Sequence, residues 1–226
     1  EYDTHQTLLS ILERDLALIS EWYAHNRLVM NWAKTNAMVI SFTSEVEDPL
    51  IIFENKIIKI ESSFKLLGVM IDNRLNFSEH ILNICSKVNR KSYILAKSFY
   101  LFTREFKITL FKLFMIPHFE YCSTLFLYSC KAEDRIKLEK CFNKNVKLFL
   151  NINLNRNDLL GQIETLKDMR LQPLLIRLFI HYSTFLFSVF KNKRAVDLIA
   201  KLKLVDHASL RFKYIQPTIS LDIFKY

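Results

Sequence analysis

The spacing of apolar positions changes character along the first third of the chain. Over residues 4–25 apolar side chains recur every three or four positions, which predicts an amphipathic helix. From residue 27 to residue 72 short β-prone runs alternate with polar segments, and Glu54-Asn55 is expected to form a tight turn between two hairpin strands. The runs that we expect to form strands cover residues 38–42, 50–53, 56–60 and 64–71.

After residue 76 the helical spacing continues almost to the end of the chain. Ser78 is followed by Glu79 and His80 and is expected to cap a helix that runs to about residue 100. A helix over 103–130 is expected to bend at Pro117. The asparagine-rich residues 151–158 indicate a connector. Further helices are expected over 132–150, 158–169, 173–191 and 194–204, and the last twenty residues show no clear period.

These patterns predict an α+β fold in two parts. A small β/α piece over residues 1–76 precedes an all-helical part over residues 77–226, with the division near residues 73–77. The composition is 50% hydrophobic and 24% charged, which excludes disorder as the main state. There are only two glycines, Gly68 and Gly161, and this excludes the glycine-rich phosphate loops of P-loop and Rossmann proteins.

The formal charge of +9 is unevenly distributed. Residues 1–63 contain five Lys/Arg and ten Asp/Glu, a net of −5, whereas residues 64–226 contain 27 and 13, a net of +14. In the first helix of the basic part, the cations fall opposite the apolar stripe. A solvated face usually mixes both signs of charge, so this face is a candidate for phosphate contact, and a merely solvated face is the alternative. The cations of this helix are Lys87, Arg90, Lys91 and Lys97.

The four cysteines form no CxxC pair, and no secretory signal precedes them. A reduced, intracellular compartment and small core side chains are therefore expected. His118 and Cys122 stand four residues apart and could share a helix face as metal ligands, but two ligands do not complete a zinc site. No metal site is predicted in this chain.

Two apolar stretches, residues 108–130 and 171–190, raise the alternative of a polytopic membrane protein. Charged or titratable residues interrupt both stretches before they reach the length of a membrane span, among them Glu120, Arg177 and His181. Both are predicted to be buried helices, and no membrane partner is expected.

Two segments carry a family resemblance. Residues 26–38 read NRLVMNWAKTNAM, and residues 64–72 read FKLLGVMID and continue through Leu75, Phe77, His80 and Ile81. In this order and spacing they resemble the reverse transcriptases of non-LTR retrotransposons, the jockey-like and CR1-like elements in particular. The similarity extends through Pro117, Tyr121 and the KLEK run at 137–140, and covers roughly residues 8–190.

The resemblance implies a palm-to-thumb portion of a polymerase. Lys34 matches the lysine of the fourth palm motif, a general acid that helps pyrophosphate to leave; alternatively, its stem packs along the protein and its head stays in water. Residues 64–72 match the strand pair of the primer grip, a hairpin to which Leu67 and Gly68 belong. Gly68 would allow a close backbone approach or an unusual turn, and a strand glycine packed under a helix is the alternative. The helices after Ser78 match the thumb, so the four cations of the first basic helix would hold duplex phosphates.

The resemblance also implies what the chain lacks. No Asp-Asp pair exists in the sequence, so the fragment alone is expected to be inactive. Mg²⁺ would be held by residues upstream of Glu1, and no cofactor is expected in the fragment itself. The implied partners are an RNA template, a DNA primer and the missing fingers and palm of the same polypeptide. The implied location is the nucleus, with a cytoplasmic ribonucleoprotein stage. The alternative function is a retroelement-derived helical interaction module that does not bind nucleic acid.

Overall fold

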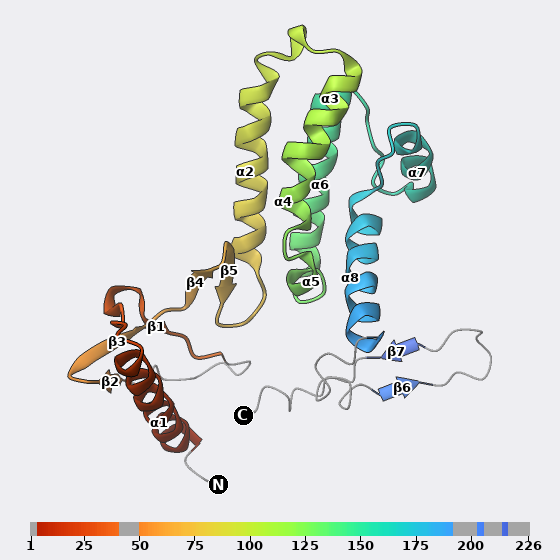
Figure 1. The fold of residues 1–226 in the computed structure, drawn as a ribbon. Helices are drawn as coiled ribbons and strands as arrows, with labels where there is room; N and C mark the ends of the chain where they lie inside the picture. The colour runs from red at the N-terminus through yellow and green to blue at the C-terminus, as the bar shows by residue number, and fades with distance from the viewer. Residues whose placement is uncertain (1–3, 41–49, 192–202, 206–213, 217–226) are drawn as a thin grey trace.

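The computed structural model describes residues 4–40, 50–191, 203–205 and 214–216. Figure 1 shows a small α/β part at the N-terminal end of the chain, a β-hairpin beside it, and a set of long helices that follows. Short strands and many helices confirm the predicted α+β class.

In the N-terminal part, helix α1 (Thr4–His25) lies against strand β2 of a three-stranded sheet. The sheet order is β1-β3-β2, with β1 parallel and β2 antiparallel to β3. Both residues of the Glu54-Asn55 turn have positive φ, as a two-residue hairpin requires, which confirms this prediction. The other elements are a 3₁₀ turn η1 (Trp32–Lys34), β1 (Asn36–Ala37), β2 (Ile51–Phe53) and β3 (Lys56–Ile60).

Two strand predictions need correction. The strand expected at 38–42 is instead the two-residue β1 (Asn36–Ala37), and residues 41–49 lie outside the described part. The run 64–71, which the spacing alone predicted as one β-prone run, is the hairpin of β4 (Ser63–Leu66) and β5 (Val69–Asp72), and this confirms the strand pair over 64–72 that the family resemblance implied. The chain reverses at Leu67 and Gly68 because both have positive φ, which a continuous strand cannot include.

The helical part begins after β5, and its core is aromatic. Helix α2 packs along α6, and the run from α3 to α4 packs against both of them (Figure 1). Phe111, Phe119 and Phe142 are completely buried between these helices. The elements are α2 (Ser78–Ala96), η2 (Phe99–Leu101), α3 (Arg104–Leu110), a π-helical segment η3 (Phe111–Met115), α4 (Ile116–Glu120), α5 (Ser123–Phe126), α6 (Ala132–Leu150), α7 (Leu159–Lys167) and α8 (Leu174–Lys191).

The helix expected over 103–130 is interrupted at a different place from the one predicted. Pro117 lies inside the first turn of α4, after a π-helical segment in which the Ile116 N–H bonds the Phe111 carbonyl. The widened turn accommodates a residue that has no N–H to donate. The chain leaves the helix at Tyr121, with ψ +119°, and Cys122, with φ +53°.

Ser78 is not the cap of α2 but its first helical residue. The cap is Phe77, with φ +56°, and the Ser78 hydroxyl donates instead to Asp134 Oδ2 of α6 at 2.6 Å. The connector between β5 and α2 is organised by Asp72, whose carboxylate accepts three backbone N–H groups at residues 74, 76 and 77. The predicted boundary between the two parts of the chain, at residues 73–77, coincides with this connector. Because α2 packs against β5 across the connector, the division into two domains stays a prediction.

The helix predictions for 132–150, 158–169 and 173–191 are confirmed, as is the connector at 151–158. The helix predicted over 194–204 is wrong at its end, since Lys203–Val205 forms strand β6 and pairs with β7 (Tyr214–Gln216). The rest of that stretch lies outside the described residues. β7 also falls in the tail where no period was found.

The two apolar stretches differ in burial. Residues 108–130 supply much of the core, but α8 buries only one side of its surface, with Leu174, Leu178 and Val189 inside and Phe179 and Phe187 outside. The buried-helix prediction is therefore wrong for most of α8. Within the described ranges α8 is a helix whose length and composition would suffice to cross a bilayer.

Candidate nucleic-acid interface

Helix α2 presents its predicted basic residues on the side away from the core. Ile81, Ile84 and Val88 are buried, whereas Lys87, Arg90 and Lys97 are exposed and Lys91 is half-buried. The apolar and basic faces therefore separate as the spacing predicted. Whether the basic face binds phosphate stays a prediction.

Helix α4 places a histidine near two of these four cations. Partial burial, followed by the nearby charges of Lys91 and Lys87, lowers the pKa of His118. Because α4 packs against α2, the half-buried His118 lies near enough to both lysines for their charges to act on it, and residues from two helices form one group. We call this cluster, made of Lys87, Lys91 and His118, the α2–α4 cluster.

The other two predicted cations lie on a different flank of α2. At about 100° per residue, Arg90 and Lys97 are separated by only about 20° from each other but by about 60° or more from Lys87. The Lys97 ammonium sits 5.0 Å from the centre of the Tyr93 ring, an exposed cation–π pair. Helical spacing therefore divides the four predicted cations into the pair whose charges act on His118, Lys87 and Lys91, and a second pair, Arg90 and Lys97.

The β4–β5 turn reaches the end of α4. The Tyr121 hydroxyl donates a hydrogen bond to the Leu67 carbonyl, and a Cβ built on Gly68 would lie 3.5 Å from Tyr121 Cε1. Gly68 is thus a turn residue with φ +93°, covered by a tyrosine ring, and not a strand glycine packed under a helix. The neighbouring Cys122 thiol raises the pKa of the Tyr121 phenol.

Helix α4 thereby connects two groups of residues that are separate in the sequence. His118 and Tyr121 are three residues apart at the end of one helix, a spacing that puts two side chains on neighbouring positions of the same face. His118 lies near the α2 lysines, whose charges lower its pKa, and Tyr121 contacts the β4–β5 turn. Sequence reasoning did not assign either residue to the interface. Their spacing was visible, but the face of α4 that meets α2 was not.

Lys34 is located elsewhere. It is exposed and ends η1, in the part of the chain that contains α1 and the three-stranded sheet (Figure 1). The Thr35 hydroxyl bonds the Asn31 carbonyl at 2.9 Å, and the Trp32 ring packs 6.2 Å from that of Phe53. The structure does not bring Lys34 together with the basic residues of α2, and its role as a general acid stays a prediction.

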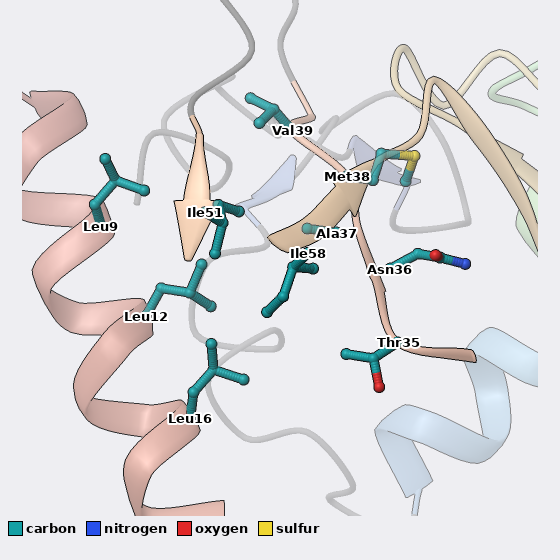
Figure 2. A pocket seen from close by; sticks show the side chains of 10 residues that line it. All are labelled: Leu9, Leu12, Leu16, Thr35, Asn36, Ala37, Met38, Val39, Ile51 and Ile58. Atoms are coloured by element: carbon teal, nitrogen blue, oxygen red, sulfur yellow. The ribbon is translucent and has the colours of Figure 1, made fainter. Parts of the chain in front are cut away.

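A cavity of about 310 Å³ lies between α1 and the sheet (Figure 2). Its lining is apolar except for Thr35 and Asn36, and it contains no carboxylate, histidine or cysteine. Across the described residues, no group of three His, Cys, Asp or Glu side chains could hold a metal ion. The apolar residues around the cavity are Leu9, Leu12, Leu16, Ala37, Met38, Val39, Ile51 and Ile58.

The remaining motif residues have structural roles. Asp72 accepts the backbone N–H groups of the connector, and Phe77 and Ile81 are buried. His80 is buried too, and its Nδ1 accepts the Met70 N–H at 3.3 Å. These residues attach the β4–β5 hairpin firmly to the start of α2.

The KLEK run also has a structural role. Lys137 and the Ser78 hydroxyl both donate to Asp134, and although burial opposes it, these two bonds lower the pKa of the Asp134 carboxyl. Glu139 is buried and accepts a hydrogen bond from Arg156 Nε at 2.8 Å. Lys137 therefore pairs with the carboxylate that bonds α2, and Glu139 ties α6 to the connector that follows it.

Comparison with known proteins gives one informative match. No family model matches the chain, and no solved structure matches it. The chain is 24% identical over 135 residues to the probable RNA-directed DNA polymerase from transposon X-element of Drosophila melanogaster. The match covers 57% of this chain and 14% of that protein. The chain is therefore related in sequence to a transposon reverse transcriptase, of which it spans a small part.

Proposed function

We propose that this chain is the palm-to-thumb portion of a non-LTR, jockey-like or CR1-like reverse transcriptase, and that it binds the template–primer duplex. The β4–β5 hairpin acts as the primer grip, and α2 acts as the duplex-binding helix of the thumb. The partners are an RNA template, a DNA primer and the rest of the polymerase. The similarity to a transposon polymerase supports this assignment.

The observation that carries the proposal is the meeting of the two predicted binding segments at α4. The Leu67-Gly68 turn contacts Tyr121. One helical turn away, α4 packs against α2, and His118 lies near enough to Lys87 and Lys91 for their charges to lower its pKa. The segments are about twenty residues apart in sequence, and each was predicted to bind nucleic acid for a different reason. A shared surface is what a protein needs to hold a duplex and the end of one of its strands together.

The chemistry of this surface suits a nucleic-acid backbone better than a base sequence. Lysine and arginine side chains neutralise phosphates without reading bases, so binding should be insensitive to sequence. Tyr93 and the exposed Leu67 side chain add apolar contact area beside the cations. Such contacts suit stacking or packing against sugars and bases.

The proposal assigns no catalysis to the chain alone. Nucleotidyl transfer needs carboxylates that hold two metal ions, and the sequence has no adjacent aspartates. In the complete polymerase these carboxylates and their Mg²⁺ belong to the remainder of the protein. Lys34 is proposed to donate a proton to pyrophosphate only when that remainder is present.

A binding titration with charge-reversed variants tests the proposal. Fluorescence anisotropy of a labelled RNA–DNA hybrid should report binding by the whole chain, and reversal of Lys87, Arg90 and Lys91 to Glu should weaken it at least about tenfold for every hybrid sequence. A control variant with Lys140, Lys144 and Lys147 of α6 reversed to Glu has the same net charge. It should keep most of the affinity. Equal losses in both variants would show that only the total charge matters and would contradict the assignment to α2.

The second candidate function is a helical interaction module that does not bind nucleic acid. The exposed apolar side chains of α8 and α1 favour it, because such surfaces often mark protein contacts. Under this reading the wild-type chain would show no measurable affinity for the hybrid but would self-associate or bind a protein partner. Sedimentation velocity beside the titration separates the two functions. The side chains concerned include Leu18, Trp22, Phe179, Phe185 and Phe187.

A further inference from the structure

The turn at the tip of the β4–β5 hairpin has a conformation that its sequence alone does not favour. Leu67 has φ +47°, which crowds the Cβ of any L-residue, and Gly68 follows with φ +93°. The Leu67 side chain is 85% exposed, so burial does not compensate for the backbone strain. Non-glycine residues in this region persist where surrounding contacts hold them, and they are frequent at functional sites.

Tyr121 supplies such contacts. Its hydroxyl donates to the carbonyl of Leu67, the strained residue itself. Its ring lies against Gly68, with Cε1 and the hydroxyl 3.5 and 3.8 Å from the position of a Gly68 Cβ. One side chain from the helical part therefore contacts both residues of the turn.

The end of α4 points Tyr121 toward the turn. The Tyr121 N–H still bonds the Pro117 carbonyl at 3.0 Å, but ψ of +119° takes the chain out of the helix, and Cys122 follows with φ +53°. Tyr121 is thus fixed to α4 on its N-terminal side. His118 of the same helix belongs to the α2–α4 cluster. Any displacement of α4 therefore moves His118 and the contact of Tyr121 with the turn together.

We propose that Tyr121 is a positioning residue that locks the Leu67-Gly68 turn to α4, so that the turn and the α2–α4 cluster bind a template–primer duplex as one rigid surface. This inference rests on the proposed function and names the residue that couples its two halves. Tyr121 carries no charge in this role. Removal of the Tyr121 hydroxyl should therefore let the turn move independently of the cluster without removing a phosphate contact.

The test is hydrogen–deuterium exchange of the whole chain, with and without a short RNA–DNA hybrid, in the wild type and in Tyr121→Phe. In the wild type the hybrid should slow exchange in residues 64–72 and in residues 84–97. In Tyr121→Phe the protection of 84–97 should remain and that of 64–72 should be lost. Affinity should fall about three- to tenfold, the worth of one hydrogen bond, and the salt dependence should not change.

A matched control is Tyr128→Phe. Tyr128 and Tyr121 are both 51% exposed, but Tyr128 packs on the Tyr182 ring, away from the turn. This variant should behave as the wild type does. Gly68→Ala changes the hairpin side of the same contact, because alanine disfavours φ +93°. This variant should lose protection of residues 64–72, as Tyr121→Phe does.

The outcomes distinguish this inference from the proposed function. Wild-type affinity together with full protection of 64–72 in Tyr121→Phe would overturn the positioning role and leave the duplex-binding function intact. Absence of protection in both segments of the wild type would overturn the function itself, and the inference with it.

Discussion

At the scale of single residues, the motif that carries the family resemblance is largely a scaffold. Asp72, Phe77, His80 and Ile81 organise or bury the junction between β5 and α2, and none of them faces the α2–α4 cluster as an exposed group. The residues that we propose to bind the duplex are instead neighbours of this motif. Leu67 and Gly68 are held at one end of the junction, and Lys87 lies two turns into the helix that begins at the other end.

His80 makes stability depend on pH. It is 4% exposed, its Nδ1 accepts the Met70 N–H, and its Nε2 has no partner among the described residues. Burial first, and then the charge of Lys87, lower the pKa of His80. Below about pH 6.5 the unfolded chain therefore binds a proton that the folded chain resists, and stability falls with a slope of at most about 1.4 kcal/mol per pH unit for one proton.

Urea unfolding between about pH 7.5 and 5.5 measures this effect. His80→Asn keeps a hydrogen-bond acceptor and does not titrate, so it should lose less stability on acidification than the wild type. His118 contributes in the same direction, since its pKa is also lowered, and a residual loss is expected. His25→Asn changes an exposed histidine of α1 and serves as the control. An unchanged pH dependence in His80→Asn would contradict the assignment.

At the scale of elements, polar residues of the apolar helix α8 attach it to α4. Arg177 Nε donates to Glu120 of α4, and His181 Nε2 lies 3.5 Å from the same carboxylate oxygen. The residues that interrupt the apolar stretch therefore dock it on the helix that contains His118 and Tyr121. Helix α8 also packs on α5 and α6, and these contacts help to hold it against α4.

This ion pair is expected to contribute measurably, because it is only partly exposed. Glu120→Gln and Arg177→Gln should each lower the free energy of unfolding by about 1–3 kcal/mol, and the double variant should cost less than the sum of the two. Arg14→Gln, which removes a fully exposed pair with Asp15, should cost less than about 0.5 kcal/mol. Chemical denaturation of the wild type, the two single variants and the double variant gives the double-mutant cycle, and Arg14→Gln is measured beside it as the control. Strict additivity would mean that the pair adds nothing to the docking of α8.

At the scale of the whole molecule, the net charge of +9 is a sum of opposite parts. The acidic N-terminal part would repel a duplex, and the basic helical part would attract it. The duplex should therefore approach from the side of α2 and not from that of α1. The net charge understates the attraction, since residues 64–226 carry +14.

The salt dependence of binding counts the phosphates that are neutralised. If four cations of α2 each release one counterion, affinity should fall about a hundredfold between about 50 and 200 mM salt. Lys91→Gln should lower the slope of log K against log salt by about one, and Lys140→Gln on α6 should leave it unchanged. Anisotropy titrations over this range give the slopes. A slope near zero for the wild type would rule out binding through phosphates.

Much of the element structure was predictable because it depends on local spacing. The helices at 4–25 and 132–150 and the Glu54-Asn55 hairpin follow from apolar periods and turn chemistry within a few residues. The errors have tertiary causes. Ser78 bonds Asp134 in place of capping its own helix, and the long helix breaks at Tyr121, where the chain meets the β4–β5 turn.

The sequence by itself determined the fold class, the uneven charge, the amphipathic α2 and the relationship to reverse transcriptases, because all of these reside in local order. Only the tertiary structure decided that α4 packs against α2 so that His118 lies near Lys87 and Lys91, and that Tyr121 holds the turn of a hairpin more than fifty residues away. The reason is physical. Helical spacing tells which residues share a face, but which element covers that face is set by the packing of a core whose members are far apart in the chain.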